Sequence, residues 1–187
     1  MDITSEKTVW QFFIGGDLNA FSTIFKTYYP QLHNYGLRIS NNIELTEDCL
    51  QDFFVYLYEH RQALGKVNCI KSYLFVSFRR AIIKSAKQDI LFESISENDG
   101  IFIFSAEEIR INEELSAQKA KLLGSILNGL STREREVIYL KFYSNLKTDE
   151  ITEVMGISYQ SVLNTLQKAF VKLRNTVETA VLRQVLK

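Results

Sequence analysis

Proline and glycine are scarce in this chain. Its 187 residues include one Pro and eight Gly, about 5% together, where an average protein carries roughly 12%. Tight turns between strands depend on these residues, so their scarcity argues against an all-β fold. Hydrophobic residues nonetheless make up 46% and aromatic residues 12% of the sequence, which is enough to build folded cores and to exclude a disordered chain. At roughly 150 residues per domain, the length predicts one large domain or two small ones.

Cysteine and histidine are also rare. Cys49 and Cys69 are the only cysteines, and their spacing indicates neither a disulfide framework nor a zinc site. His33 and His60 are the only histidines, and neither follows a Glu by three residues, so a carboxylate-bridged metal bundle lacks its ligands. A glycine-rich phosphate loop and a nucleophile motif are missing too. We therefore expect no metal, no cofactor, no small-molecule substrate and no enzymatic activity.

Long apolar runs are missing as well. The longest uncharged apolar run, 73–78, is far shorter than the ~20 residues that a membrane-spanning helix needs. The first ten residues include Asp2 and Glu6 and lack the basic start and apolar stretch of a signal peptide. We expect a soluble, cytoplasmic protein that is not inserted in a membrane.

Apolar residues recur at spacings of three and four almost throughout, which predicts an all-α protein. Asp17 is placed to cap a helix that continues past Pro30 to Ile39. Thr46 is predicted to open the next helix, and a third spans about 70–87.

The segment 89–116 differs in composition from its flanks. It contains eight Asp and Glu against one Arg, and Ser-Glu-Asn-Asp-Gly at 96–100 would break a helix. We therefore predict two small helical bundles, 1–88 and 117–187, joined by an acidic linker at 89–116.

The second bundle contains a sequence signature for a helix-turn-helix. Ser131 and Glu134 have the spacing of a capping box, and the helix that follows is expected to bury Val137, Ile138, Leu140 and Phe142. A short helix from Thr148 would end at Gly156, and Ser158 would cap a long final helix. The buried stripe of that helix is expected to be Val162, Leu166, Ala169, Phe170, Leu173 and Val177. An ordinary pair of antiparallel helices is the alternative interpretation of this pattern.

Five stretches together resemble a known family. Residues 130–140, 148–158 and 162–174 resemble region 4 of bacterial sigma factors, 46–58 resembles region 2.2, and 72–83 resembles regions 2.3 and 2.4. The order of the two regions is the family's order, and only these two fit in the length. The chain is therefore similar to the extracytoplasmic-function (ECF) group of the sigma-70 family, and its recognition helix resembles those of Bacteroidetes members.

The resemblance implies a dissociable subunit of RNA polymerase without catalytic residues of its own. Region 2 would dock on the core enzyme, recognise the −10 element and help to open the duplex, and region 4 would recognise the −35 element. The partners implied are core RNA polymerase, promoter DNA and an anti-sigma factor, since many ECF factors are held inactive by a membrane-anchored one.

The distribution of charge agrees with these roles, although the net charge is zero. Residues 41–60 hold five acids and no Lys or Arg, and Asp48, Gln51 and Asp52 on this stretch are the expected docking residues for core polymerase. A solvated helix face is the alternative for this acidic surface.

Residues 61–87 reverse the sign, with seven Lys and Arg and no acid. Opening DNA requires phosphate neutralisation and flat surfaces for unstacked bases. Contacts to −10 DNA are expected from Arg79, Arg80, Lys84 and Lys87. The interleaved aromatics could instead be core residues, which is the interpretation favoured for Tyr73 and Phe78. By resemblance, 62–69 is a loop that captures an unstacked base.

The N-terminal end of the final helix supplies the expected −35 contacts: Tyr159, Gln160, Ser161, Leu163, Asn164, Lys168 and Lys172. Gln160 and Asn164 could each pair with adenine, Leu163 could contact a thymine methyl, and the lysines would bind phosphates. The family commonly has basic residues at the positions of Leu163 and Thr165, so DNA affinity of the chain alone should be weak.

Other functions remain as alternatives. A stand-alone helix-turn-helix regulator is the main one, and it should bind a promoter fragment without polymerase. A response regulator would need an alternating βα receiver, which 1–90 does not indicate, and a helical adaptor would not explain the basic stretch. The tail 175–187 could pack back on region 4, bind a partner or pair with a second copy.

Overall fold

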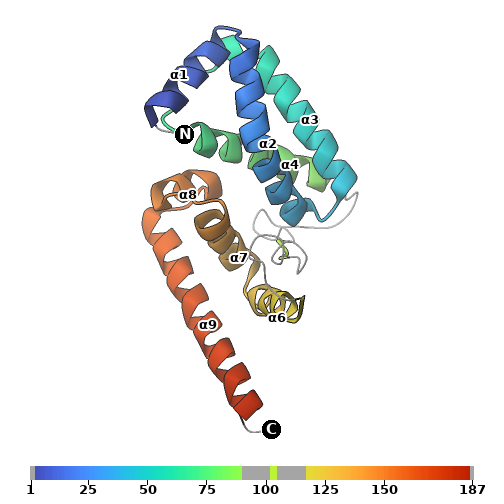
Figure 1. The fold of residues 1–187 in the computed structure, drawn as a ribbon, viewed down its shortest axis with the longest axis vertical. Coiled ribbons are helices and arrows are strands. Elements are labelled where there is room, and N and C mark those ends of the chain that lie inside the picture. The colour runs from blue at the N-terminus through green and yellow to red at the C-terminus, as the bar shows by residue number, and fades with distance from the viewer. Residues whose placement is uncertain (1–2, 90–101, 105–116, 186–187) are drawn as a thin grey trace. The chain divides into compact units, whose positions relative to one another are not determined.

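A computed structural model describes residues 3–89, 102–104 and 117–185 of the chain, and Figure 1 labels its helices. Within these ranges all regular structure is helical, which confirms the predicted all-α class. The chain divides into two compact units close to residues 95 and 96, and each is treated by itself below. Most of the predicted linker, 89–116, lies outside the described residues.

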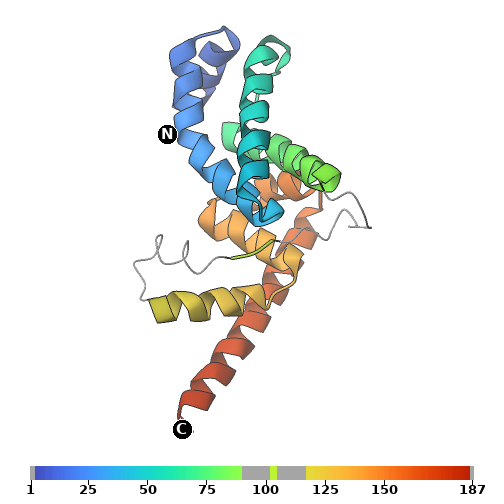
Figure 2. The ribbon, with the colours of Figure 1, turned by 90° about the vertical axis from the view of Figure 1, so that its right-hand side faces the viewer.

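The N-terminal unit consists of α1 (Ile3–Ile14), α2 (Leu18–Ser40), α3 (Ile43–Glu59), the 3-10 turn η1 (Arg61–Ala63) and α4 (Ile70–Asp89). Helices α2 and α3 run side by side, and α4 crosses both (Figures 1 and 2). Helix α1 precedes the first helix that the sequence predicts, and it packs on α2, on η1 and on α4.

Capping side chains set the helix starts in this unit. The Asp17 carboxylate accepts hydrogen bonds from the backbone N–H groups of Asn19 and Ala20, as predicted, and α2 continues through Pro30. The start predicted for α3 was one turn late, because Asn42 and not Thr46 caps it. Thr46 is fully buried, and its hydroxyl donates to the Asn42 carbonyl.

A dense core holds α2, α3 and α4 together. Its fully buried side chains include Leu32, Tyr35, Leu50, Leu74, Phe75, Phe78 and Ile82. Gly36 marks the closest approach of the helices: a Cβ atom added there would lie 2.8 Å from Thr46 Cγ2 and 3.0 Å from the Phe78 ring. The absence of a side chain at this position therefore lets the three helices meet.

The C-terminal unit consists of α6 (Ala117–Asn128), α7 (Thr132–Ile138), the π-helical turn η2 (Tyr139–Tyr143), α8 (Thr148–Met155) and α9 (Tyr159–Val185). Helices α6 and α7 both pack on α9 (Figure 1). The predicted capping box is present, since Ser131 and Glu134 bond each other's backbone N–H groups. The prediction that Phe142 is buried was wrong: it is 52% exposed, and its ring lies 5.7 Å from that of Phe170. Phe170 and Val177 were predicted on the buried stripe of the final helix, and both are exposed as well.

Two residues from the predicted linker belong to the core of this unit. Phe102 and Phe104 are buried against Tyr139, and Phe104 also meets Tyr143. The Asn128 side chain bonds both backbone groups of Phe104, accepting from its N–H and donating to its carbonyl, each at 2.9 Å. This segment is therefore an anchored part of the C-terminal unit and does not serve only as a spacer.

Candidate nucleic-acid interface

Two short-range features form the turn between α8 and α9. Gly156 ends α8 in the left-handed conformation, at φ 63°, which a residue without a Cβ adopts most easily. The Ser158 hydroxyl then accepts a hydrogen bond from the Ser161 N–H at 3.2 Å and caps α9. Ile151 and Val162 are fully buried. The predicted helix-turn-helix is therefore formed.

The N-terminal face of α9 presents most of the predicted base-contacting residues to solvent. Tyr159 is 54% and Leu163 38% exposed, Gln160 and Asn164 are exposed, and Ser161 is half-buried. The Gln160 amide donates to Asn164 Oδ1 at 2.9 Å. The two amides therefore occupy each other, and this pair must open before both can bind bases separately.

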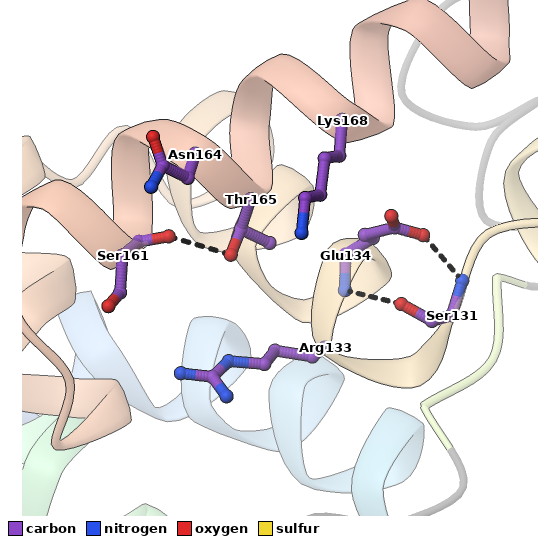
Figure 3. A pocket seen from close by; sticks show the side chains of 7 residues that line it. All are labelled: Ser131, Arg133, Glu134, Ser161, Asn164, Thr165 and Lys168. Atoms are coloured by element: carbon purple, nitrogen blue, oxygen red, sulfur yellow. Dashed lines mark hydrogen bonds between the residues drawn. The ribbon is translucent and has the colours of Figure 1, made fainter.

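An open pocket of about 320 Å³ lies between the start of α7 and α9 (Figure 3). It is lined by Ser131, Arg133, Glu134, Ser161, Asn164, Thr165 and Lys168. Arg133 and Lys168 bring two cations to the pocket beside the polar side chains of Asn164 and Ser161, so its chemistry suits an oxyanion such as a phosphate. Sequence reasoning missed Arg133, because only the packing of α7 on α9 brings this residue close to α9.

The buried carboxylate of Glu134 is part of the wall of this pocket. Glu134 Oε2 accepts from the Ser131 N–H and from Lys172 Nζ, both at 2.8 Å. Burial by itself would raise the pKa of Glu134, but the hydrogen bonds from Lys172 and Ser131 outweigh it and lower the pKa below its ordinary value. Lys172, which was predicted to bind phosphate, thus has an ionic partner within the unit.

The basic face of the N-terminal unit lies on α4. Arg80, Lys84 and Lys87 are exposed, and Arg79 is half-buried. The interpretation of the interleaved aromatics as core residues holds for Phe75 and Phe78, which are fully buried. Tyr73 is half-buried and packs edge-on against Trp10 at 5.4 Å between ring centroids.

The predicted docking residues lie on the acidic face of the N-terminal unit, on α3. Asp48, Gln51 and Asp52 are all exposed on α3. Next to them, an open groove of about 730 Å³ runs between α2 and α3. We call it the aromatic groove, and it is lined by Phe21, Phe25, Tyr29, Glu47, Gln51, Phe54, Val55, Tyr58 and Glu59. The helical period identified the acidic face, but it could not show that side chains of two helices combine in one groove.

The described residues contain no group of three or more His, Cys, Asp or Glu side chains placed to bind a metal ion. Among the helices within the described ranges, none is both long enough and apolar enough to span a lipid bilayer.

Comparison with known proteins gives concordant matches. A family model described as sigma-70, region 4 matches residues 120–173. The chain is 23% identical to the RNA polymerase sigma factor YlaC of Bacillus subtilis, over 85% of this chain and 92% of that protein. It is also 23% identical to the ECF RNA polymerase sigma factor SigL of Mycobacterium tuberculosis, over 88% and 95%.

Two solved structures share the fold. CnrH, in complex with the cytosolic domain of CnrY, superimposes with a TM-score of 0.64 at 18% identity, covering 93% of this chain and 97% of that one. The sigma factor RpoE of Bartonella quintana, in complex with the anti-sigma factor NepR, gives a TM-score of 0.60 at 15% identity, covering 86% and 98%.

Proposed function

We propose that this chain, a member of the ECF group of the sigma-70 family, binds core RNA polymerase, directs it to specific promoters and helps to open the DNA. The observation that carries the proposal is the helix-turn-helix of α8 and α9, whose N-terminal face is exposed and polar. The long matches to sigma factors, which cover both units, support it. The chain would act in the cytoplasm as an initiation factor and not as an enzyme.

The −35 element would be recognised by α9. Asn164 and Gln160 are the base-recognition candidates, since an amide can pair bidentately with adenine once their mutual hydrogen bond opens. Leu163 would contact a thymine methyl, and Tyr159 and Ser161 would flank these contacts. Phosphates would be bound by Lys168 together with Arg133 in the pocket of Figure 3. Lys172, which is paired with Glu134, would bind a further phosphate.

The −10 element would be bound by α4. Its exposed cations, Arg80, Lys84 and Lys87, and the half-buried Arg79 would neutralise phosphates when the strands separate. Because Phe75 and Phe78 are buried in the core, they are not available as stacking surfaces, and unstacked bases must be held elsewhere. The predicted loop before α4, 62–69, is the candidate.

Core polymerase would dock on α3. The exposed acids Asp48 and Asp52 and the Gln51 amide would face a basic surface of the polymerase, and the aromatic groove beside them would accept an apolar side chain. Because the RpoE structure contains an anti-sigma factor, we also propose that a protein of that kind binds this chain and competes with polymerase.

Transcription with purified components tests the proposal. Core polymerase of the source organism, the chain alone and the two combined are each incubated with a library of randomised promoters, and transcripts are sequenced. We expect specific transcripts only from the combination. Specific binding of a promoter fragment by the chain alone, with no gain of transcription by the combination, would instead identify a stand-alone regulator.

A further inference from the structure

The loop 61–69, between α3 and α4, is bonded to a side chain of α1. The indole Nε1–H of Trp10 donates to the Gly65 carbonyl at 3.1 Å, across 55 positions of the sequence. The Trp10 ring is 2% exposed and packs against Phe13 at 5.3 Å and Tyr73 at 5.4 Å between centroids. Through Tyr73, this cluster also contacts the start of α4, immediately after the loop.

The beginning of the same loop is fixed as well. Arg61 donates from Nη1 to the Tyr58 carbonyl at 2.7 Å, and its guanidinium lies 4.3 Å from the centre of the Tyr58 ring. Beyond it, Gln62, Lys66 and Asn68 are exposed. The loop thus presents two amides and one cation on a backbone that is fastened at its start and at its middle.

We propose that Trp10 is a positioning residue for promoter opening: it holds the loop 61–69 in the conformation that receives an unstacked base of the −10 element. The inference rests on the proposed function and goes beyond it, because α1 lies outside the stretches that carry the resemblance to the family. Exposed amides and a lysine are the groups that bind base edges and phosphates of a single strand.

Fixing the loop in advance matters because a strand that binds a mobile loop must also order it. Ordering costs conformational entropy, and each such cost is subtracted from the affinity. Packing alone can bury a tryptophan ring, but a buried indole N–H also needs a hydrogen-bond acceptor. Here the acceptor is the Gly65 carbonyl, so the burial of Trp10 on α1 depends on the position of the loop backbone. Packing of the ring without this bond would not connect the two.

The variant Trp10→Phe keeps an aromatic ring in the cluster and removes the donor. The probe is a labelled single strand that carries the non-template −10 sequence of a promoter recovered in the transcription experiment, and it is titrated with holoenzyme. We expect about fivefold weaker binding and correspondingly slower opening of the full promoter, since a typical net hydrogen bond has this effect on an equilibrium. Affinity for core polymerase and for duplex −35 DNA should not change.

A matched control separates positioning from stability. Phe13→Leu disturbs the same cluster, because Phe13 is fully buried against Trp10, but it leaves the indole donor in place. Its melting temperature should fall while binding of the single strand by the folded holoenzyme stays at the wild-type level. Equal losses of strand binding in the two variants, at equal losses of stability, would overturn the positioning role.

A spectroscopic measurement on the unmutated chain does not depend on the folding of any variant. Trp10 is the only tryptophan, so a chain grown with 5-fluorotryptophan and combined with unlabelled core gives one fluorine resonance. We expect this resonance to shift when the −10 strand is added and to stay in place with an unrelated strand. If the strand binds without a shift and Trp10→Phe binds it as tightly as wild type, the inference is wrong and the proposed function stands. If wild-type holoenzyme does not bind the strand, both fail.

Discussion

On the N-terminal unit, the aromatic groove between α2 and α3 presents rings beside glutamates, whereas the face of α9 on the C-terminal unit presents amides and lysines. An apolar groove with acidic edges suits a basic protein surface, because burial of the rings supplies affinity and the acids select the partner. The amides and lysines of the α9 face suit a nucleic acid, and Tyr159 and Leu163 are exposed beside them. Under the proposed function, the aromatic groove would therefore serve protein recognition and the face of α9 base recognition, although both are built only from helices.

The most severe test of this division removes the acids of the N-terminal unit. Replacing Asp48 and Asp52 by Lys together should weaken binding to core polymerase at least ~100-fold, because two attractions become repulsions at one interface. Both side chains are exposed on α3, so the fold should persist, which circular dichroism checks. Affinity is measured by titrating labelled core with the variant.

Asp149→Lys is the control for this experiment. Asp149 is exposed in the first turn of α8, and its reversal also adds positive charge to the chain. Core affinity should change little. Retained core binding by the double variant at Asp48 and Asp52, or an equal loss from Asp149→Lys, would contradict the assignment of docking to α3.

The comparison extends to stability, because the N-terminal unit depends on close helix packing. Gly36→Ala should destabilise it by about 2 kcal/mol, since the new methyl group would overlap Thr46 Cγ2 and the Phe78 ring, both in the core. Fluorescence of the single tryptophan, Trp10, follows unfolding of this unit alone in urea. An unchanged midpoint, or a variant more stable than wild type, would show that the helices can separate without loss.

Features that depend on neighbours in sequence could be predicted, and features that depend on packing could not. Asp17, the Ser131 and Glu134 box, and Ser158 each bond backbone within three residues, so their roles are visible in the sequence. The start of α3 was misplaced because Asn42 and Thr46 both carry capping oxygens, and only packing decides that Thr46 is buried.

The candidate sites show the same limit. The exposed acids on α3 and the amides on α9 follow from helical period alone. The ion pair of Lys172 with Glu134 spans 38 positions, and the backbone of Phe104 is bonded by Asn128, which lies on α6, 24 positions away. The composition of 89–116 suggested a spacer, because its average is acidic and the aromatic residues Phe102 and Phe104 change that average little.

A smaller effect is expected on the face of α9. Asn164→Ala should lower discrimination among −35 variants by roughly 1–3 kcal/mol at one or two base pairs, because the amide proposed to pair with adenine is lost. Lys168→Ala, at an exposed residue of the same pocket, should weaken all promoters equally and reduce the salt dependence. Transcription from a set of single-base −35 variants distinguishes the two patterns. An unchanged ranking of promoters in Asn164→Ala would remove Asn164 from the recognition residues.

The smallest expected effect is on the pH dependence of stability, through the buried Glu134 of the C-terminal unit. The described ion pair of the N-terminal unit, His33 with Glu47, has no buried carboxylate. Since its pKa is lowered in the folded chain, its ionised form stabilises the C-terminal unit. This contribution is complete above the pKa of the unfolded carboxyl, and it is lost as the pH falls through the lower, folded pKa. The partly exposed Lys172 limits it to about 1 kcal/mol.

Urea unfolding between pH 7 and pH 3 measures this contribution, with circular dichroism for both units and Trp10 fluorescence for the N-terminal one. In Glu134→Gln, the acid-dependent loss of the C-terminal transition should shrink relative to wild type, while the Trp10 transition keeps its wild-type pH dependence. An identical pH dependence in wild type and Glu134→Gln would mean that the carboxylate fixes the capping box without stabilising it by charge.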